Sequence, residues 1–445
     1  MKKLNVIIAV FLVALTAIGW ISYITTSSSD LIEYNKNIED AEAFTDQGLY
    51  YRAIDSYAKA IEYRPSEKNW TSLLAVCVLN CGEYPSYLSN YIDYLESAVA
   101  QYPKNVDFIY ELATAYYNDE SYSSAYNVVL NAVENGVKDE KITTLMQELK
   151  YLYKLEGSPF YSFYSPVHDT YVVQTAGGWG TMTTEGQFSS SEYPYYGPLS
   201  ENGERLFTTA ELGARLYNEN DEVLAKFEGN VTDAGRLSEG LIAIQLDDGK
   251  YAYYNEFGKK QFGDYDAAGT FHDGKAAVQI GGKWGVIDQQ GETVVDAKFD
   301  EIVLDNYGYF NNQEVVVACI DGKYSLYDDS LNKVSDFEAE DMGIPTADNK
   351  IAFCQSGKWG YIDTQGKVLI EPAYDGALSF SNGLAGVRVG DAWGFIDTDN
   401  NIVIQCEFAG VDYFNADGTC CVRVDSGIGE DTTPQWQMLV LELGL

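Results

Sequence analysis

The sequence predicts a multidomain protein: an N-terminal transmembrane helix, an all-α solenoid and an all-β repeat array. Three observations predict it. An uncharged apolar run follows the first lysines, alanines and aromatics then recur at helical spacing, and a tryptophan-glycine dipeptide recurs from about residue 160 onward. At 445 residues the chain is also too long for a single hydrophobic core, so several domains are expected.

The charge balance excludes one class of partner. The chain carries 67 acidic and 29 basic residues, giving a formal net charge of −38. So negative a surface repels phosphate backbones, and nucleic-acid binding is therefore not expected. A cationic protein partner or a neutral glycan is compatible with it.

The first residues predict a membrane anchor. Residues 1–4 include Lys2 and Lys3, residues 5–25 are uncharged and mostly apolar, and the acidic segment DLIEYNKNIED follows. This length spans a bilayer, and the flanking charges place residues 1–4 in the cytoplasm and the remainder outside. A cleaved signal peptide ending near Ala17-Ile18-Gly19 is the alternative, but the apolar run continues past it and favours an uncleaved signal anchor.

Residues 33–156 predict helical repeats. In AEAFTDQGLYYRAIDSYAKAIEYRP, small residues, aromatics and a final proline recur at the spacing of two packed helices. A second unit contains Leu74, Ala75, Val78 and Gly82, and a third contains Leu112, Ala113 and Ala125. KDEKITTLMQELKYLYKL then predicts a solvating cap helix.

This region resembles the tetratricopeptide repeat family. Arrays of that family bind a peptide or protein segment along a concave face. The resemblance implies that Asp107, Tyr110, Thr114 and Tyr117 line this face in the third unit. Ordinary packing or solvated surface is the alternative role for these four side chains.

Residues 160–445 predict a β array with a period near 35 residues. The clear copies of the repeat carry Trp179, Trp284, Trp359 and Trp393, and the weaker copies carry Ala214, Tyr251, Tyr324 and Trp436. An aromatic follows three of the tryptophans after 15 residues, at Phe299, Tyr374 and Phe408. Each copy reads as strand, polar turn, strand, loop and strand.

These copies resemble the WG-repeat family, whose hallmark is the tryptophan-glycine pair seen here at Trp284-Gly285, Trp359-Gly360 and Trp393-Gly394. The glycine is expected to let a neighbouring aromatic lie against the backbone. The array is either a closed, propeller-like ring or an open superhelical ribbon. Because the first and last copies agree poorly with the others, as capping units do, the open ribbon is favoured.

Chemical sites are weakly indicated. Asp397-Thr398-Asp399-Asn400-Asn401 resembles the start of a calcium loop, but its sister turns favour a plain hairpin. The two histidines, His168 and His272, are assigned to one loop position of the repeat rather than to a catalytic triad. The seven cysteines show no disulfide or zinc spacing. No metal, cofactor or catalytic residue is expected.

These observations predict a non-enzymatic binding or scaffold protein that is exported and held at the bacterial cell surface by its anchor. Protein-protein interaction through both repeat types is the first functional hypothesis. Binding of cell-wall glycan by exposed Trp and Tyr rings is the alternative. Buried anchor tryptophans would support a packing role, and exposed rows of rings would support glycan contact.

Overall fold

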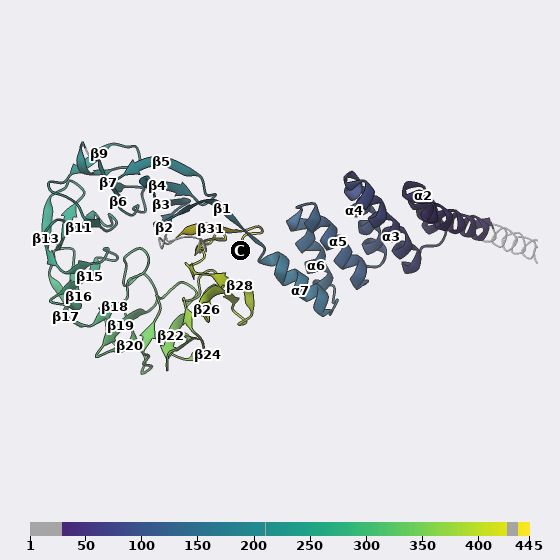
Figure 1. Ribbon diagram of the computed structural model, residues 1–445. Coiled ribbons are helices and arrows are strands. Elements are labelled where there is room, and N and C mark those ends of the chain that lie inside the picture. The colour runs from purple at the N-terminus through teal and green to yellow at the C-terminus, as the bar shows by residue number, and fades with distance from the viewer. Residues whose placement is uncertain (1–28, 210, 425–434) are drawn as a thin grey trace, which may run out of the picture. The chain divides into compact units, whose positions relative to one another are not determined.

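The computed structural model describes residues 29–209, 211–424 and 435–445. The chain divides into two compact units, Met1–Lys150 and Tyr151–Leu445. The first is helical and the second is a ring of small sheets (Figure 1). The boundary precedes the predicted one, because residues 153–156, predicted to be helical, begin the first strand.

The helical unit consists of paired antiparallel helices. Residues 29–46 are helical. The following helices are α2 (Tyr50–Tyr63), α3 (Glu67–Glu83), the short 3-10 helix η1 (Pro85–Tyr87), α4 (Leu88–Gln101), α5 (Val106–Asn118), α6 (Tyr122–Glu134) and α7 (Glu140–Lys150). Alanines that lack exposed surface, such as Ala53, Ala98 and Ala113, lie where helices pack closely. Ser66 and Asn105 cap α3 and α5 by accepting hydrogen bonds from backbone amides.

The second unit contains eight small antiparallel sheets among the described residues, which we call blades 1 to 8. Blade 1 consists of β2 (Ser162–Val167), β3 (Thr170–Thr175), β4 (Gly178–Thr183) and β5 (Phe188–Tyr193), and blade 2 of β6 (Tyr195–Tyr196), β7 (Arg205–Thr209), β8 (Gly213–Tyr217) and β9 (Val223–Lys226). Blade 3 consists of β10 (Asp233–Ala234), β11 (Leu241–Gln245), β12 (Tyr251–Asn255) and β13 (Lys260–Tyr265), and blade 4 of β14 (Ala267–Ala268), β15 (Lys275–Ile280), β16 (Lys283–Asp288) and β17 (Thr293–Phe299).

Blade 5 consists of β18 (Glu301–Ile302), β19 (Val316–Ile320) and β20 (Lys323–Tyr327). Blade 6 consists of β21 (Asp341–Met342), β22 (Ile351–Gln355), β23 (Lys358–Ile362) and β24 (Val368–Tyr374), and blade 7 of β25 (Gly376–Ala377), β26 (Leu384–Val389), β27 (Ala392–Asp397) and β28 (Ile402–Phe408). Blade 8 combines β29 (Gly410–Val411), β30 (Thr419–Arg423) and β31 (Trp436–Leu441) with β1 (Tyr153–Phe160).

Each blade packs on both faces against its neighbours, which explains the continuous apolar runs in the second and third strands. In β15, Ala276 and Val278 belong to the cluster shared with blade 3, whereas Ala277 belongs to the cluster shared with blade 5. In the described part of the propeller, seven apolar clusters each join two successive blades. From the contact of blades 1 and 2 to that of blades 7 and 8, in order, they contain Val172 with Phe207, Leu216 with Ile244, Tyr253 with Val278, Val286 with Ala318, Leu326 with Phe353, Tyr361 with Val387, and Phe395 with Leu439.

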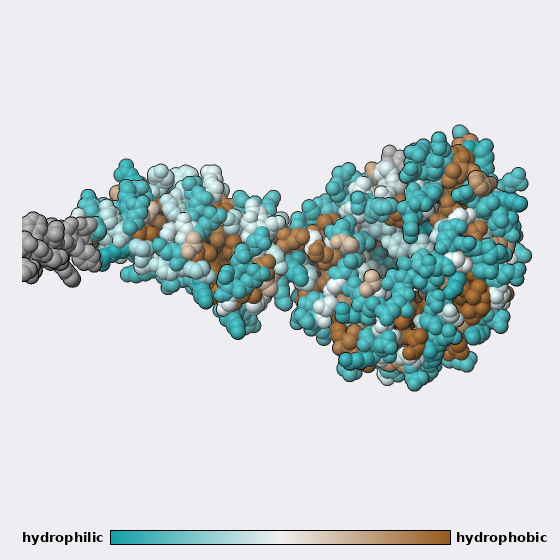
Figure 2. All heavy atoms as spheres, turned by 180° about the vertical axis from the view of Figure 1, so that it is seen from behind, coloured by the Kyte–Doolittle hydropathy of each residue, from teal (hydrophilic) through white to brown (hydrophobic). Residues whose placement is uncertain are grey.

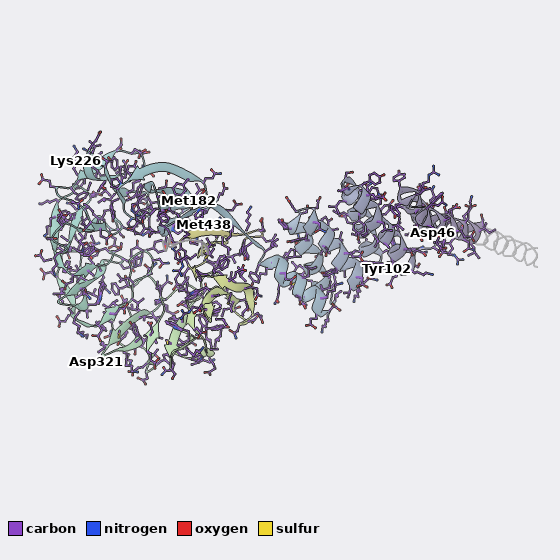
Figure 3. The ribbon with its side chains drawn as sticks, in the orientation of Figure 1. Asp46, Tyr102, Met182, Lys226, Asp321 and Met438 are labelled. Carbon is purple, nitrogen blue, oxygen red and sulfur yellow. The ribbon has the colours of Figure 1, made fainter. Side chains whose placement is uncertain are left out.

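The ring is closed, so the prediction of an open superhelical ribbon is wrong. Strand β1 pairs with β31, with Tyr153 opposite Leu441. Blade 8 also packs on blade 1 through a cluster that contains Met182 and Met438, which lie close together in Figure 3. The unit is therefore an eight-bladed propeller. The end copies diverge because both ends of this unit build one blade, and not because they cap an open array.

The predicted membrane span is not supported. Within the described ranges, no helix is long and apolar enough to cross a membrane. The predicted anchor, residues 5–25, and the predicted cytoplasmic residues 1–4 lie outside those ranges. The single-pass membrane localisation is corrected accordingly and takes no part in the functional proposal.

Candidate functional site

The four side chains predicted to bind peptide share one face of α5. Asp107 is 81% exposed at its side chain and lies 3.8 Å from the Lys141 ammonium of α7. The same ammonium lies 3.7 Å from the centre of the Tyr110 ring. Thr114 donates a hydrogen bond to the Tyr110 carbonyl, and the Tyr117 ring packs against Tyr122 of α6. The structure therefore brings the four together, with α7 already contacting two of them.

A groove lies between α3 and α5, next to this face. It is a cavity of ≈ 190 Å³ lined by Thr71, Ala75 and Val78 of α3 and by Asn105, Asp107, Phe108 and Glu111 at α5. On the α3 side, Ala75 and Val78 form a small apolar surface, and Val78 is 51% exposed. The α5 side carries two carboxylates. An apolar wall facing an acidic wall suits a segment that presents an apolar and a basic side chain together.

Glu111 gives the groove its electrostatic character. The Tyr91 hydroxyl of α4 donates a hydrogen bond of 3.2 Å to its carboxylate. Partial burial raises the pKa of Glu111, and the nearby Asp107 charge acts in the same direction. The Tyr91 hydrogen bond and the Lys141 charge act against this shift, but Glu111 forms no ion pair with a described lysine or arginine, so a ligand cation would offset the cost of its desolvation further.

The α3 wall was not predicted from the sequence, although a signal for it exists. When the two repeats are aligned on their capping residues, Ser66 and Asn105, α3 has equivalents of the predicted peptide-binding residues. Thr71, Ala75 and Val78 take the repeat positions of Tyr110, Thr114 and Tyr117, respectively. The predicted register aligned Ala75 with the buried Ala113 instead. Ala75 is exposed in α3, and Leu74 takes the buried position.

The anchor tryptophans of the propeller occupy matching places in their blades. Trp284, Trp359 and Trp393 pair with Phe299, Tyr374 and Phe408, respectively, on the outermost strand. Trp179 pairs with Tyr193 in the same way. All four tryptophans are half-buried and stand on the third strand of a blade. Their role is packing, and rows of exposed rings, on which the glycan alternative depended, are not formed by these anchors.

The glycine after Trp284, Trp359 and Trp393 is required by the backbone of the outermost strand rather than by an aromatic ring, which corrects the expected role. The strand pairing shifts register at Gly285, and a Cβ atom there would lie 2.6 Å from the Val295 carbonyl oxygen. Gly360 and Gly394 meet the Ile370 and Ile404 carbonyls in the same manner. Only glycine permits this approach.

The residues that resembled a calcium loop form a hairpin turn. Asp397 accepts hydrogen bonds from the amides of Asp399 and Asn401, and Asp288 and Asp363 do the same in their own turns. Across the residues that the structure describes, no group of three or more His, Cys, Asp or Glu side chains is placed to hold a metal ion.

The two histidines do not occupy equivalent positions, contrary to the prediction. His168 has a φ of 51° and stands in the turn between β2 and β3, where blade 4 has Asp273 with a φ of 50°. The His272 ring lies 5.0 Å from the Tyr309 ring instead.

All seven cysteines are free. Burial raises the pKa of Cys77 to about 12 and raises that of Cys420 and Cys421 well above the usual value. These three thiols are therefore protonated at neutral pH and behave as small apolar side chains.

Part of the propeller matches a known family model. Residues 261–284, 284–324, 359–391 and 393–426 match the model described as "WG containing repeat". These segments cover the tryptophan-glycine copies of blades 4, 6 and 7. No curated protein sequence matches the chain.

Several solved structures resemble the two units. BamB from Moraxella catarrhalis is 9% identical with a TM-score of 0.44, over 65% of this chain and 100% of that chain. The Dos1 propeller is 11% identical with a TM-score of 0.41, over 66% and 94%. A tetratricopeptide repeat protein from Parabacteroides merdae is 18% identical with a TM-score of 0.23, over 27% and 46%. Likeness at this level carries no information on what the chain binds. The propeller therefore contains segments that match a WG-repeat model, and the helical unit consists of paired antiparallel helices.

Proposed function

We propose that this protein is a non-enzymatic binding protein whose helical unit holds a segment of a partner protein in the groove between α3 and α5. The observation that carries the proposal is the juxtaposition of Val78, exposed on α3, with Asp107 and Glu111 on α5. An open apolar position beside two carboxylates selects a segment in which an aliphatic side chain neighbours a lysine or arginine.

The partner segment adds contacts that the unit cannot make alone. Its aliphatic side chain would cover Val78 and Ala75, which are exposed now, and remove apolar area from water. Its cation would lie against Glu111, whose burial already disfavours the isolated charge. Lys141 would keep its place over Tyr110, so α7 would border the site rather than occupy it.

The test is selection of peptides from a random displayed library on the full chain, followed by affinity measurement. We expect enriched peptides to carry lysine or arginine next to an aliphatic residue. Val78→Ser and Glu111→Gln should each weaken their binding by about tenfold, or roughly 1.4 kcal/mol. Tyr51→Ser, at an exposed aromatic of α2 outside the groove, is the matched control and should leave affinity unchanged.

Enrichment without a basic residue, or affinity that ignores both groove substitutions, would refute the groove as the site. A separate measurement tests the proposal that the protein is not an enzyme. A turnover that one carboxylate substitution abolishes would show that the protein is an enzyme.

A further inference from the structure

The propeller contains a second feature with the character of a binding site, a cavity of ≈ 440 Å³ at the hub. Loops from five blades line it, and in each blade the loop is the one between the first and second strands. Such a volume lies in the range of small-molecule sites and exceeds what a bare ion needs. Figure 2 shows hydrophilic residues over most of the face of the ring seen there.

One wall of the cavity is held firmly by Tyr307, which belongs to the long loop between β18 and β19. Its hydroxyl donates a hydrogen bond of 3.2 Å to the Pro166 carbonyl in blade 1. Its own carbonyl accepts a 2.9 Å hydrogen bond from the Thr270 hydroxyl in blade 4. The Arg236 guanidinium lies 4.4 Å from the ring centre. Contacts to three other blades fix this ring at the hub before any ligand arrives.

The lining is negatively charged, and the nearest described cation, Arg236, lies behind Tyr307 and acts on Asp305. Asp169, Asp305, Asp412 and Asp417 line the cavity, whereas no lysine or arginine does. Within the part of the chain that the structure describes, none of these four forms an ion pair. A cation entering the cavity would meet uncompensated charge.

Two of these carboxylates maintain the loops, and the other two remain for a ligand. Asp305 accepts hydrogen bonds from the Tyr307 and Tyr309 amides, and Asp417 accepts them from Thr419. Asp169 is exposed at the mouth. Among the described residues, the Asp412 carboxylate accepts hydrogen bonds from the Asn306 side chain and the Tyr413 amide, and its burial raises its pKa to about 6. A ligand cation beside Asp412 would offset the loss of hydration of that carboxylate.

The lining also restricts the kind of cation. A metal ion needs several oxygen or nitrogen ligands converging within bonding distance, and the described residues provide no such group of His, Cys, Asp or Glu. Amide and hydroxyl oxygens at Asn306, Gln313 and Ser381 can accept N–H hydrogen bonds instead. The aromatic ring of Tyr413, which also lines the cavity, adds a surface that attracts ammonium groups.

We propose that the hub cavity of the propeller binds an organic ammonium group, which Asp412 and Asp169 recognise by charge. The ammonium belongs either to a free oligoamine or to the lysine side chain of a peptide. This site is distinct from the groove of the helical unit and does not depend on it.

The test is isothermal titration calorimetry on the full chain at neutral pH with spermidine, with the tripeptide Gly-Lys-Gly and with 1,8-octanediol as the uncharged control. We expect heat from at least one amine and none from the diol. Asp412→Asn and Asp169→Asn should each weaken amine binding by about tenfold. Asp341→Asn removes a partly buried carboxylate in blade 6 that does not line the cavity, and should leave binding within about twofold.

Each outcome of the titrations either identifies the ligand of the hub cavity or overturns the proposal. Heat from spermidine alone assigns the site to a free amine, and heat from the lysine peptide alone assigns it to a protein ligand. Absence of heat from both amines overturns the proposal, as does equal binding of the diol. Binding that survives both Asp412→Asn and Asp169→Asn, in variants whose near-ultraviolet circular dichroism matches the parent, also overturns it.

Discussion

At the residue scale, the outermost strand of a blade lies so close to the third strand that one position of the pair has no space for a Cβ atom. The chain meets this requirement in more than one way. All four clear copies place glycine after the tryptophan. Blade 3 places Ala252 there, and its outermost strand supplies Gly263, whose added Cβ would overlap the Ala252 Cβ. Blade 5 places Ser325 there, and its sheet has only three strands. The free volume is therefore a property of the strand pair and not of one residue.

Gly263→Ala tests this interpretation. We expect it to destabilise the propeller by roughly 2 kcal/mol, because two Cβ atoms would claim the same space. Adding Ala252→Gly should restore most of the loss, since the pair then has the arrangement of the tryptophan-glycine copies. Urea unfolding followed by tryptophan fluorescence measures both. Gly235→Ala is the control, as its nearest neighbour would lie 3.7 Å away; a double variant no more stable than Gly263→Ala would contradict the interpretation.

Asp412 predicts a pH dependence of stability. Its pKa in the fold, about 6, exceeds the usual 3.8 because burial disfavours the carboxylate. The folded state therefore holds the proton more tightly, so stability is greatest below about pH 4 for this group and is lost as pH rises through 6, by up to about 3 kcal/mol. The Tyr171 and Tyr413 hydroxyls and the Cys420 and Cys421 thiols beside it have raised pKa values and stay protonated throughout.

Unfolding free energies of the parent chain and of Asp412→Asn, measured from about pH 4 to about pH 8, check this expectation, because this range brackets the titration of the carboxyl group. The difference between the two free energies should change as the pH rises from about 4 through about 6, and should level off above about pH 7. A constant difference would contradict it. Asp305 and Asp341 also have raised pKa values from burial, but they are common to both chains and cancel.

The sequence predicted most of this residue-scale organisation. The anchor tryptophans, their partner aromatics and the Asp-based turns recur at fixed spacing, so a pattern reveals them. The exchange between Ala252 and Gly263 has no such signal, because the two residues lie on different strands and meet only when the register is known. The cavity at the hub is equally hidden, since Asp169 and Asp412 come from opposite ends of the propeller sequence.

At the scale of elements, β1 is the piece that completes blade 8. Its residues Tyr153–Glu156 and Phe160 pair with β31, with a register shift between them, and Phe160 is fully buried and lies opposite Trp436. Its sequence, YKLEGSPF, lacks the alternation of a half-buried strand, and YKLE continues the polar-apolar pattern of α7. This is why its first residues were predicted to be helical and why closure was not foreseen.

Two truncated chains test the role of β1. A chain of residues 151–445 retains it, and a chain of residues 162–445 lacks it. We expect the first to unfold cooperatively and the second to lose at least about 3 kcal/mol, because removing Phe160 alone empties a large buried site. Differential scanning calorimetry compares them. Equal melting temperatures would contradict the closure by β1.

At the scale of the whole molecule, excess negative charge opposes compaction. The ion pairs repeat from blade to blade, as in Lys283–Asp300 and Lys358–Asp375, but they are solvent-exposed and contribute little each. With a formal net charge of −38, repulsion among the remaining carboxylates outweighs the attraction within these pairs.

Added salt should therefore stabilise the protein. Raising sodium chloride from about 10 mM to about 150 mM shortens the screening length from roughly 30 Å to roughly 8 Å. We expect the melting temperature of the propeller to rise by roughly 2–4 °C for each kcal/mol of repulsion that is screened. Calorimetry at the two concentrations measures it, and a fall in melting temperature would show that ion pairing dominates instead.

The pairing of Tyr153 with Leu441 also governs the order of events on the ribosome. The nascent chain releases β1 before the other seven blades, yet the strand that it pairs with emerges after them. Seven blades can form while β1 waits with unpaired amides and an apolar Phe160, a segment that binds chaperones or neighbouring chains readily. Slow closure of this last contact would then set the time at which the newly made protein becomes resistant to proteolysis.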